Sequence, residues 1–149
     1  APVAGKEFDL RLFVSFSIPP KDLKAMVEEA ADAGATVVFR GPADGKDFSM
    51  ARFAQKLKAL GVTRAGALQM DPPSFTKFRI QRVPTYVLSE RTESAKEVDG
   101  CAPPGSYAVI AGTMSPEYAL NIFKTGSRKE LAEAAERRLY ALRDKRGQK

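Results

Sequence analysis

The chain of 149 residues contains no histidine and only one cysteine, Cys101. Without imidazole it cannot form the Ser-His or Cys-His pairs that activate nucleophiles, nor a zinc or iron site that depends on histidine ligands. A lone cysteine also excludes an intramolecular disulfide and a thiolate-rich metal cluster. We therefore expect no catalytic residues, no metal and no cofactor.

Long apolar runs are also missing. No stretch approaches the ~18 to 20 continuous apolar residues that cross a bilayer, so we expect no integral membrane segment. The first residues, 1–5, do not begin with methionine and suit either a processed export precursor or a shortened chain. The composition, 44% hydrophobic and 28% charged, is typical of one globular domain with a core.

Positive charge is concentrated at one end of the chain. Residues 124–149 hold nine Lys or Arg against four acids, which accounts for most of the formal net charge of +6. A segment of this kind can meet nucleic acid, an anionic membrane or an acidic partner, although a solvated helix face is the commoner reason for it.

Hydrophobic periodicity predicts alternating strands and helices. Residues 10–17 (LRLFVSFS) suit a buried strand that ends at a proline pair, and apolar side chains recur at helical spacing over 19–33. A strand over 35–40 completes a βαβ unit, so these two strands are expected to be parallel. The other expected elements are a helix around 50–60 capped by Asp47 or Ser49, a strand within 64–70, a short helix from Asp71, strands over 84–90 and 107–112 joined by a long loop, a helix from Ser115, and a last helix with a Ser127–Glu130 capping box.

The phenylalanines fall on the apolar sides of these elements, and the simplest role for them is in the core. The set comprises Phe13, Phe16, Phe39, Phe53, Phe75, Phe78 and Phe123. We divide the chain into a flexible N-terminal segment (1–9), one α/β domain (10–126), and a basic C-terminal helix and tail (127–149).

This order of elements resembles a thioredoxin-like fold with a helical insertion, as in periplasmic disulfide isomerases: a central mixed sheet flanked by helices. Residues 13–20 (FVSFSIPP) resemble the strand-to-helix junction where redox-active members carry C-x-x-C, and residues 82–85 (RVPT) resemble their cis-proline turn. Ser17 and Pro20 occupy the two cysteine positions. The resemblance implies a cis Val83–Pro84 bond and a redox-inactive domain.

Four stretches, FVSFSIP, AGATVVFRG, QMDPPSFTKFRIQRVPTYVLS and GTMSPEYAL, are similar to the TrbC family of pilin assembly proteins from F-type conjugative transfer systems. The similarity runs from about residue 11 to 123. It implies a periplasmic protein that assembles the conjugative pilus within a type IV secretion apparatus and associates with the partner protein TraW. The loop around Cys101 and the basic helix after Gly126 depart from the family pattern, so partner contacts there are not inherited.

The expected partner-binding surface is the groove between this junction and the proline turn. In active relatives the turn exposes the backbone of the residue before proline, so Val83 could pair with a partner strand. Ser17 is interpreted as a helix N-cap and not as a nucleophile, because no base stands beside it. Ile18→Arg is expected to weaken partner capture without unfolding the domain. The groove comprises Ser17, Ile18, Pro19, Pro20, Val83, Pro84 and Thr85.

Two alternatives remain open beside this non-enzymatic docking role. One is a thiol-disulfide oxidoreductase or chaperone that uses Cys101 with a partner cysteine, although a free surface cysteine is the simpler interpretation. The other is a nucleic-acid-binding module that uses the basic tail. We expect no nucleic-acid partner, because basic and aromatic residues are not interleaved along an exposed strand as single-strand binders require.

Overall fold

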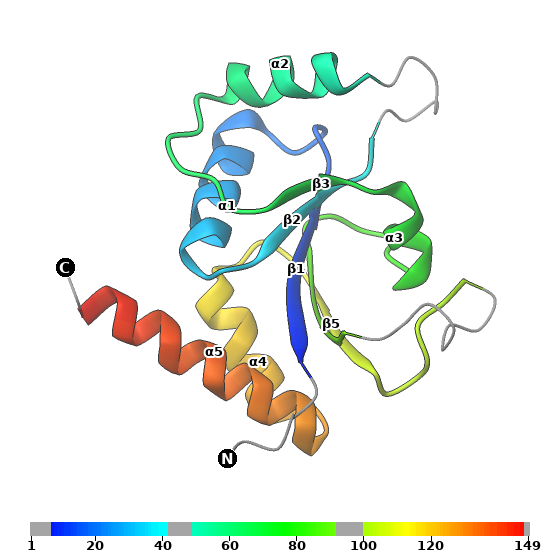
Figure 1. The fold of residues 1–149 in the computed structure, drawn as a ribbon, viewed down its shortest axis with the longest axis vertical. Coiled ribbons are helices and arrows are strands. Elements are labelled where there is room, and N and C mark those ends of the chain that lie inside the picture. The colour runs from blue at the N-terminus through cyan, green and yellow to red at the C-terminus, as the bar shows by residue number, and fades with distance from the viewer. Residues whose placement is uncertain (1–6, 42–48, 92–99, 148–149) are drawn as a thin grey trace.

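The computed structural model describes residues 7–41, 49–91 and 100–147. This part of the chain holds five strands and five helices (Figure 1). In chain order they are β1 (Phe8–Val14), α1 (Pro20–Asp32), β2 (Thr36–Phe39), α2 (Met50–Leu60), β3 (Leu68–Met70), α3 (Pro72–Lys77), β4 (Thr85–Glu90), β5 (Tyr107–Ala111), α4 (Pro116–Gly126) and α5 (Lys129–Gly147).

The strands form one mixed sheet in the order β3-β2-β1-β4-β5. Parallel pairing joins β1 to β2 and β2 to β3, whereas β4 is antiparallel to both β1 and β5. The β1-α1-β2 unit and the β4-β5-α4 unit therefore meet at the central strand β1. This confirms the α/β fold class and its thioredoxin-like arrangement, with α2, β3 and α3 inserted between the two units.

Helix ends follow local capping chemistry at two of the predicted positions. The Ser49 Oγ accepts a hydrogen bond from the Arg52 amide (3.1 Å), and the Ser115 Oγ accepts one from the Tyr118 amide (3.1 Å). Asp47, the other candidate cap of α2, lies outside the described residues.

The predicted capping box of the last helix is wrong. Because α5 begins at Lys129, Arg128 stands at the N-cap position and its carbonyl accepts the first intrahelical bond, from the Ala132 amide. Ser127 precedes that position and ends α4, with its own amide bonded to the Phe123 carbonyl.

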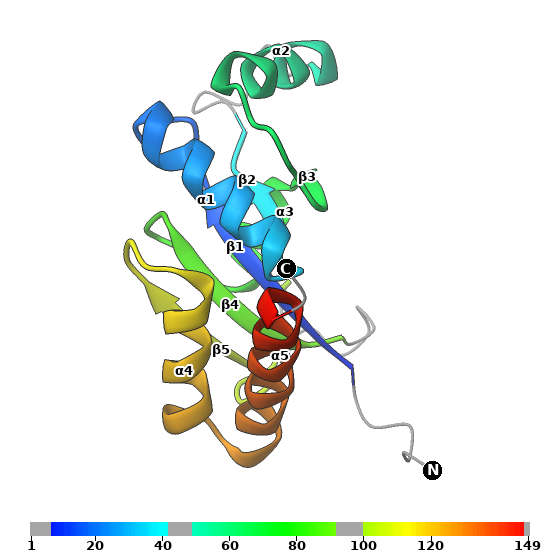
Figure 2. The same ribbon diagram turned by 90° about the vertical axis from the view of Figure 1, so that its left-hand side faces the viewer.

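Helices cover the two faces of the sheet unequally. α1, α4 and α5 lie over one face, which Figure 2 views directly, while α3 lies over the other (Figure 1). The α3 side has its own small apolar cluster, in which the rings of Phe13 and Phe75 meet edge to face with centroids 4.9 Å apart. Six of the seven predicted core phenylalanines are buried, and Phe16 is partly buried.

α5 belongs to the same core as the sheet. Its residues Leu131, Ala135 and Leu139 are buried in the cluster that contains the central strand. At the other terminus β1 starts at Phe8, so the strand begins two residues before the predicted start at 10. Residues 1–6 of the expected flexible segment lie outside the described residues.

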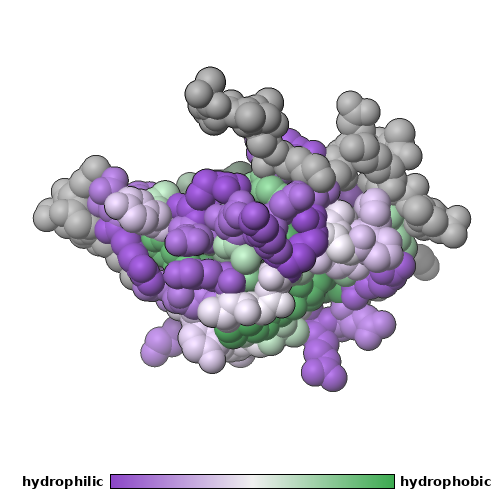
Figure 3. Space-filling model, turned by 90° about the horizontal axis from the view of Figure 1, so that it is seen from below, coloured by the Kyte–Doolittle hydropathy of each residue, from purple (hydrophilic) through white to green (hydrophobic). Residues whose placement is uncertain are grey.

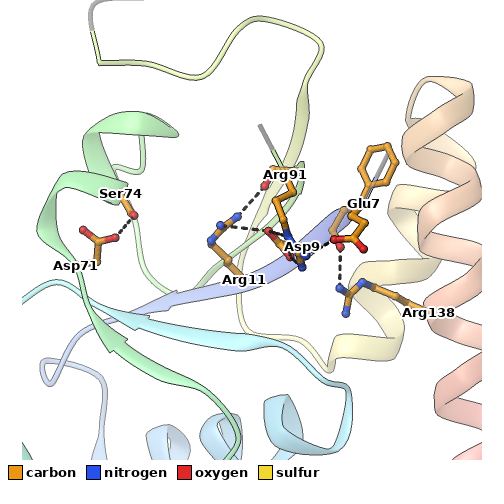
Figure 4. Close-up of polar contacts among 9 residues, drawn as sticks. Glu7, Asp9, Arg11, Asp71, Ser74, Arg91 and Arg138 are labelled. Atoms are coloured by element: carbon orange, nitrogen blue, oxygen red, sulfur yellow. Dashed lines mark hydrogen bonds and ion pairs between the residues drawn. The ribbon is translucent and has the colours of Figure 1, made fainter. Parts of the chain in front are cut away.

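A cluster of charged side chains joins β1, β4 and α5 at the end where β1 starts (Figure 4). Asp9 accepts a hydrogen bond from Arg91 (Nη2 to Oδ1, 2.6 Å), and Arg11 donates to the Ser89 hydroxyl (2.7 Å). Arg138 of α5 donates to the Phe8 carbonyl (2.9 Å). Burial raises the pKa of the Asp9 carboxyl, but the bond from Arg91 and the surrounding arginine charges outweigh it and leave that pKa lowered. Burial lowers the pKa of Arg138.

Candidate partner-binding site

A tight turn connects the end of β1 to the start of α1. The Ile18 amide donates to the Ser15 carbonyl (3.2 Å), and the Oγ atoms of Ser15 and Ser17 lie 2.5 Å apart. Ser17 is therefore not the N-cap of α1, contrary to the sequence prediction. Pro19 occupies the N-cap position and its carbonyl accepts from the Leu23 amide (2.9 Å), because the helix begins only at Pro20.

The proline turn stands beside this junction. Phe13 pairs with Thr85 across β1 and β4, so the residues that follow β1 and those that precede β4 leave the sheet at the same end. The Val83–Pro84 peptide bond is cis. The turn is held by two bonds: the Thr85 hydroxyl donates to the Arg82 carbonyl (2.6 Å), and the Gly112 amide donates to the Pro84 carbonyl (2.9 Å).

Val83 is the residue of this turn with free backbone groups. In the part of the chain that the structure describes, neither its N–H nor its C=O makes a hydrogen bond. Its side chain is partly buried and packs against both apolar clusters. The side chain thus anchors the turn while the peptide groups remain available to a partner.

The seven predicted groove residues divide by burial. Ser17, Pro19 and Pro20 are exposed, and Val83 and Pro84 are half-buried. Ile18 and Thr85 are buried, with 8% and 2% of their surface exposed.

Burial of Ile18 overturns the expectation for Ile18→Arg. Ile18 belongs to the main core cluster, so the substitution would bury a charge and destabilise the domain. The exposed part of the groove consists of Ser17, Pro19 and Pro20 with the peptide groups of Val83.

Phe16 forms one wall of the junction. Its ring stacks on Phe39 with centroids 4.8 Å apart, and the Lys56 Nζ lies 5.1 Å from the ring centroid. The position of Lys56 was not predicted, because nothing in the sequence places α2 against this turn. The contact between Ser15 and Ser17 was not predicted either, although the Ser-x-Ser spacing at a strand end was a usable signal.

The chemistry that the junction offers is hydrogen bonding. The Ser17 hydroxyl bonds to Ser15, and no base contacts it within the described residues. No three metal-ligating side chains come together in residues 7–41, 49–91 and 100–147. Among the helices of these same ranges, none has the length and apolar character to cross a membrane.

Cys101 lies away from the junction, beside α3. Its Sγ is 3.7 Å from the Thr76 carbonyl oxygen, and the thiol is partly exposed. It lines a surface hollow together with Arg40, Phe75 and Arg79. The thiol thus sits on the α3 face of the sheet, whereas α1 and its junction belong to the face covered by α1, α4 and α5 (Figure 1).

Several cations of the basic C-terminal region make contacts within the domain. Arg128 contacts the Glu90 carboxylate and the Gly105 carbonyl. The Arg143 Nε lies 3.8 Å from a carboxylate oxygen of Glu117, and Arg138 bonds to β1 as described above. Three of the nine basic residues of this region therefore contact the rest of the domain.

Comparisons with known proteins agree with the sequence resemblance. The family model described as "Type-F conjugative transfer system pilin assembly protein" matches residues 12–123. This range includes the junction, the proline turn, the end of β1 and all of β2, β3, β4 and β5. No curated protein and no solved structure matches the chain. Because the family model covers well over half of the sequence, the chain belongs to the family of type-F conjugative transfer system pilin assembly proteins.

Proposed function

We propose that this chain is a redox-inactive scaffold of the conjugative type IV secretion system, which acts in pilus assembly by binding a TraW-like component in the periplasm. Membership of the pilin assembly family supports a role among the proteins of the transfer system. The docking surface consists of Ser17, Pro19 and Pro20 with the backbone of Val83.

The observation that carries this proposal is the unbonded backbone of Val83 beside an exposed junction. A free N–H and C=O can pair with an incoming strand, and such pairing supplies affinity without requiring a matching side chain. The exposed Ser17 hydroxyl and the proline rings would flank that strand. The same groove holds a substrate in thiol-dependent relatives, and here it would hold a partner.

The absence of redox chemistry follows from the groups at the junction. Thiol-disulfide exchange needs an attacking thiolate, and a second thiol must then resolve the mixed disulfide. Ser17 and Pro20 supply neither, and the one thiol of the chain belongs to Cys101 beside α3. We therefore assign no reaction to this domain.

Capture of purified TraW by the immobilised domain tests the proposal. Ser17→Arg and Pro19→Arg each place a bulky cation in the groove at an exposed position, so both should fold normally and lower TraW retention about tenfold or more. Gln55→Arg adds the same charge at an exposed site on α2 and is the matched control, with capture unchanged. Retention equal to wild type in both groove variants, with folding verified by circular dichroism, would exclude the groove as the docking site.

A further inference from the structure

β5 is an edge strand with one free side. Within the described chain it pairs only with β4. The bonds from Gly112 N to the Pro84 carbonyl and from Glu90 N to the Ser106 carbonyl show that the even-numbered residues of this segment face β4. Because bonding alternates along an antiparallel pair, Tyr107, Val109 and Ala111 direct their N–H and C=O groups outward.

The same three residues place their side chains on the α3 face. Along a strand, both the direction of the peptide groups and the face of the side chains alternate with every residue. The alternate residues of β5, Ala108 and Ile110, pack against the main core on the opposite face. α3 does not reach the β5 edge of the sheet: Val109 is 45% exposed, and with Ala111 and Thr85 it lines a surface hollow. Seen from below, a hydrophobic area lies among hydrophilic side chains (Figure 3), on the side of the molecule where α4 and β5 lie (Figure 2).

The rim of this hollow is cationic. Arg79 and Arg82 line it, and Arg79 also lines the adjoining hollow with Arg40. No acidic side chain lines either hollow, and none of the three arginines forms an ion pair with a described carboxylate. Arg79 donates to the Tyr107 hydroxyl (3.3 Å), and Arg40 lies over the Phe75 ring at 5.0 Å from its centroid.

Several other arginines of the described chain do pair with carboxylates. Arg64 bonds to Asp32 (2.8 Å), Arg91 to Asp9 (2.6 Å), and Arg128 to Glu90. Within the described residues, the surface beside β5 combines an open strand edge, an exposed valine and guanidinium groups that form no ion pair. An open strand edge is a template for pairing with another chain, and the arginines beside it would favour a chain that carries negative charge.

We propose that the β5 edge binds an extended acidic segment of another protein, which adds to the sheet as a sixth strand. Its peptide groups would bond to Tyr107, Val109 and Ala111, and its alternate side chains would project over the α3 face toward Arg79 and Arg82. Carboxylates at those positions complement the two arginines, and bidentate pairing gives the strand its register. This surface is distinct from the junction groove, so the result of the TraW capture experiment neither supports nor contradicts this proposal.

Peptide binding tests the proposal directly. The probe is a blocked, fluorescently labelled peptide of alternating glutamate and valine, about seven residues long to match a strand, measured by anisotropy and by backbone amide shifts. The expected result is saturable binding that weakens with added salt and shifts the amides of Tyr107 to Ala111. A lysine-valine peptide should bind about tenfold more weakly or not at all. N-methylation at the positions that face β5 should abolish binding, whereas methylation at the alternate positions should not.

Two variants connect this binding to the edge and to its charge. Val109→Pro removes an outward N–H without removing a bond to β4, so the sheet is retained while strand addition is blocked; Val109→Thr keeps the donor and is its control. Arg82→Gln should weaken the glutamate peptide about fivefold to tenfold and should not weaken the lysine peptide.

Four outcomes would overturn the proposal. One is equal binding of the two peptides, and another is unchanged binding by a folded Val109→Pro protein. The third is displacement of the glutamate peptide by an equimolar amount of a single-stranded oligonucleotide. The preferred ligand of the arginines would then be a phosphate backbone and not a peptide. Concentration-dependent dimerisation that masks the β5 amides without peptide would assign the edge to a second copy of this chain.

Discussion

At the scale of single residues, the contribution of Asp9 to stability should depend on pH in a way that can be measured. Its folded-state pKa is lowered, because the bond from Arg91 and the nearby arginine charges outweigh the opposing effect of burial. A carboxyl with a depressed folded pKa contributes stability above its unfolded pKa of about 3.9, and that contribution is lost as the pH falls through the folded value. The protein should therefore lose stability progressively below about pH 4.

Asp9→Asn should lower the free energy of unfolding at pH 7 by about 1 to 2 kcal/mol, because charge-assisted bonds from partly exposed arginines are lost. The variant should also show a shallower decline of stability in acid. Urea unfolding between pH 7 and pH 2 measures both quantities. Asp144→Asn, at an exposed position on α5, is the matched control and should follow wild type. Parallel pH curves for wild type and Asp9→Asn would remove Asp9 from the acid response.

Residue identities alone predicted some local roles and misassigned others. Ser49, one of two candidate caps, and Ser115, the predicted start of a helix, both serve as caps, because each directly precedes a clear apolar periodicity. Ser17 precedes two prolines, and these delay the helix until Pro20, so its hydroxyl turns to Ser15 instead. The burial of Ile18 was missed because a turn residue has no periodic pattern that reveals which side faces the core.

At the scale of whole elements, α5 offers the clearest contrast between two adjacent residues. Leu139 is 2% exposed within the main core, whereas Tyr140 is 77% exposed. Leu139→Ala should lower the free energy of unfolding by about 2 to 4 kcal/mol, and Tyr140→Ala should change it by less than about 0.5 kcal/mol.

Urea titration followed by circular dichroism and by tyrosine fluorescence measures this difference. Both probes should report one transition, since α5 shares the core with the sheet. An early helical transition separate from the rest, with Leu139→Ala affecting only that step, would instead make α5 an independent appendage.

Element boundaries were predictable where capping residues and apolar periodicity agree, as for α2 between Ser49 and Gly61. The amphipathic pattern of α5 was visible too, but amphipathicity does not say which apolar surface a helix covers. Its position depends on contacts between distant parts of the chain. Arg138 bonds to the carbonyls of both Phe8 and Gly34, more than a hundred residues earlier, and no local pattern encodes such a pairing.

At the scale of the whole molecule, local units account for only part of the sheet order. A βαβ unit predicts the parallel β1–β2 pair and a hairpin predicts the antiparallel β4–β5 pair, but the pairing of β1 with β4 was expected only from the resemblance to a thioredoxin-like fold. The candidate groove followed from that order, because it brings the end of β1 beside the start of β4. The cationic β5 edge did not, since the exposure of Arg79 and Arg82 depends on how α3 sits over the sheet.

The same architecture predicts that redox activity is absent because the junction has no thiols, and that the fold itself could support such activity. Ser17→Cys with Pro20→Cys, made in a Cys101→Ser background, puts two thiols at the start of α1, where the helix N-terminus favours a thiolate. With dithiothreitol as reductant, this variant should accelerate the reduction of insulin disulfides: its dithiol passes two electrons to insulin, becomes a disulfide, and is reduced again. Wild type and Cys101→Ser should both remain at the uncatalysed rate. Wild-type activity that disappears in Cys101→Ser would make the natural chain an oxidoreductase, and a folded but inactive double variant would show that the junction and the proline turn do not form a working groove.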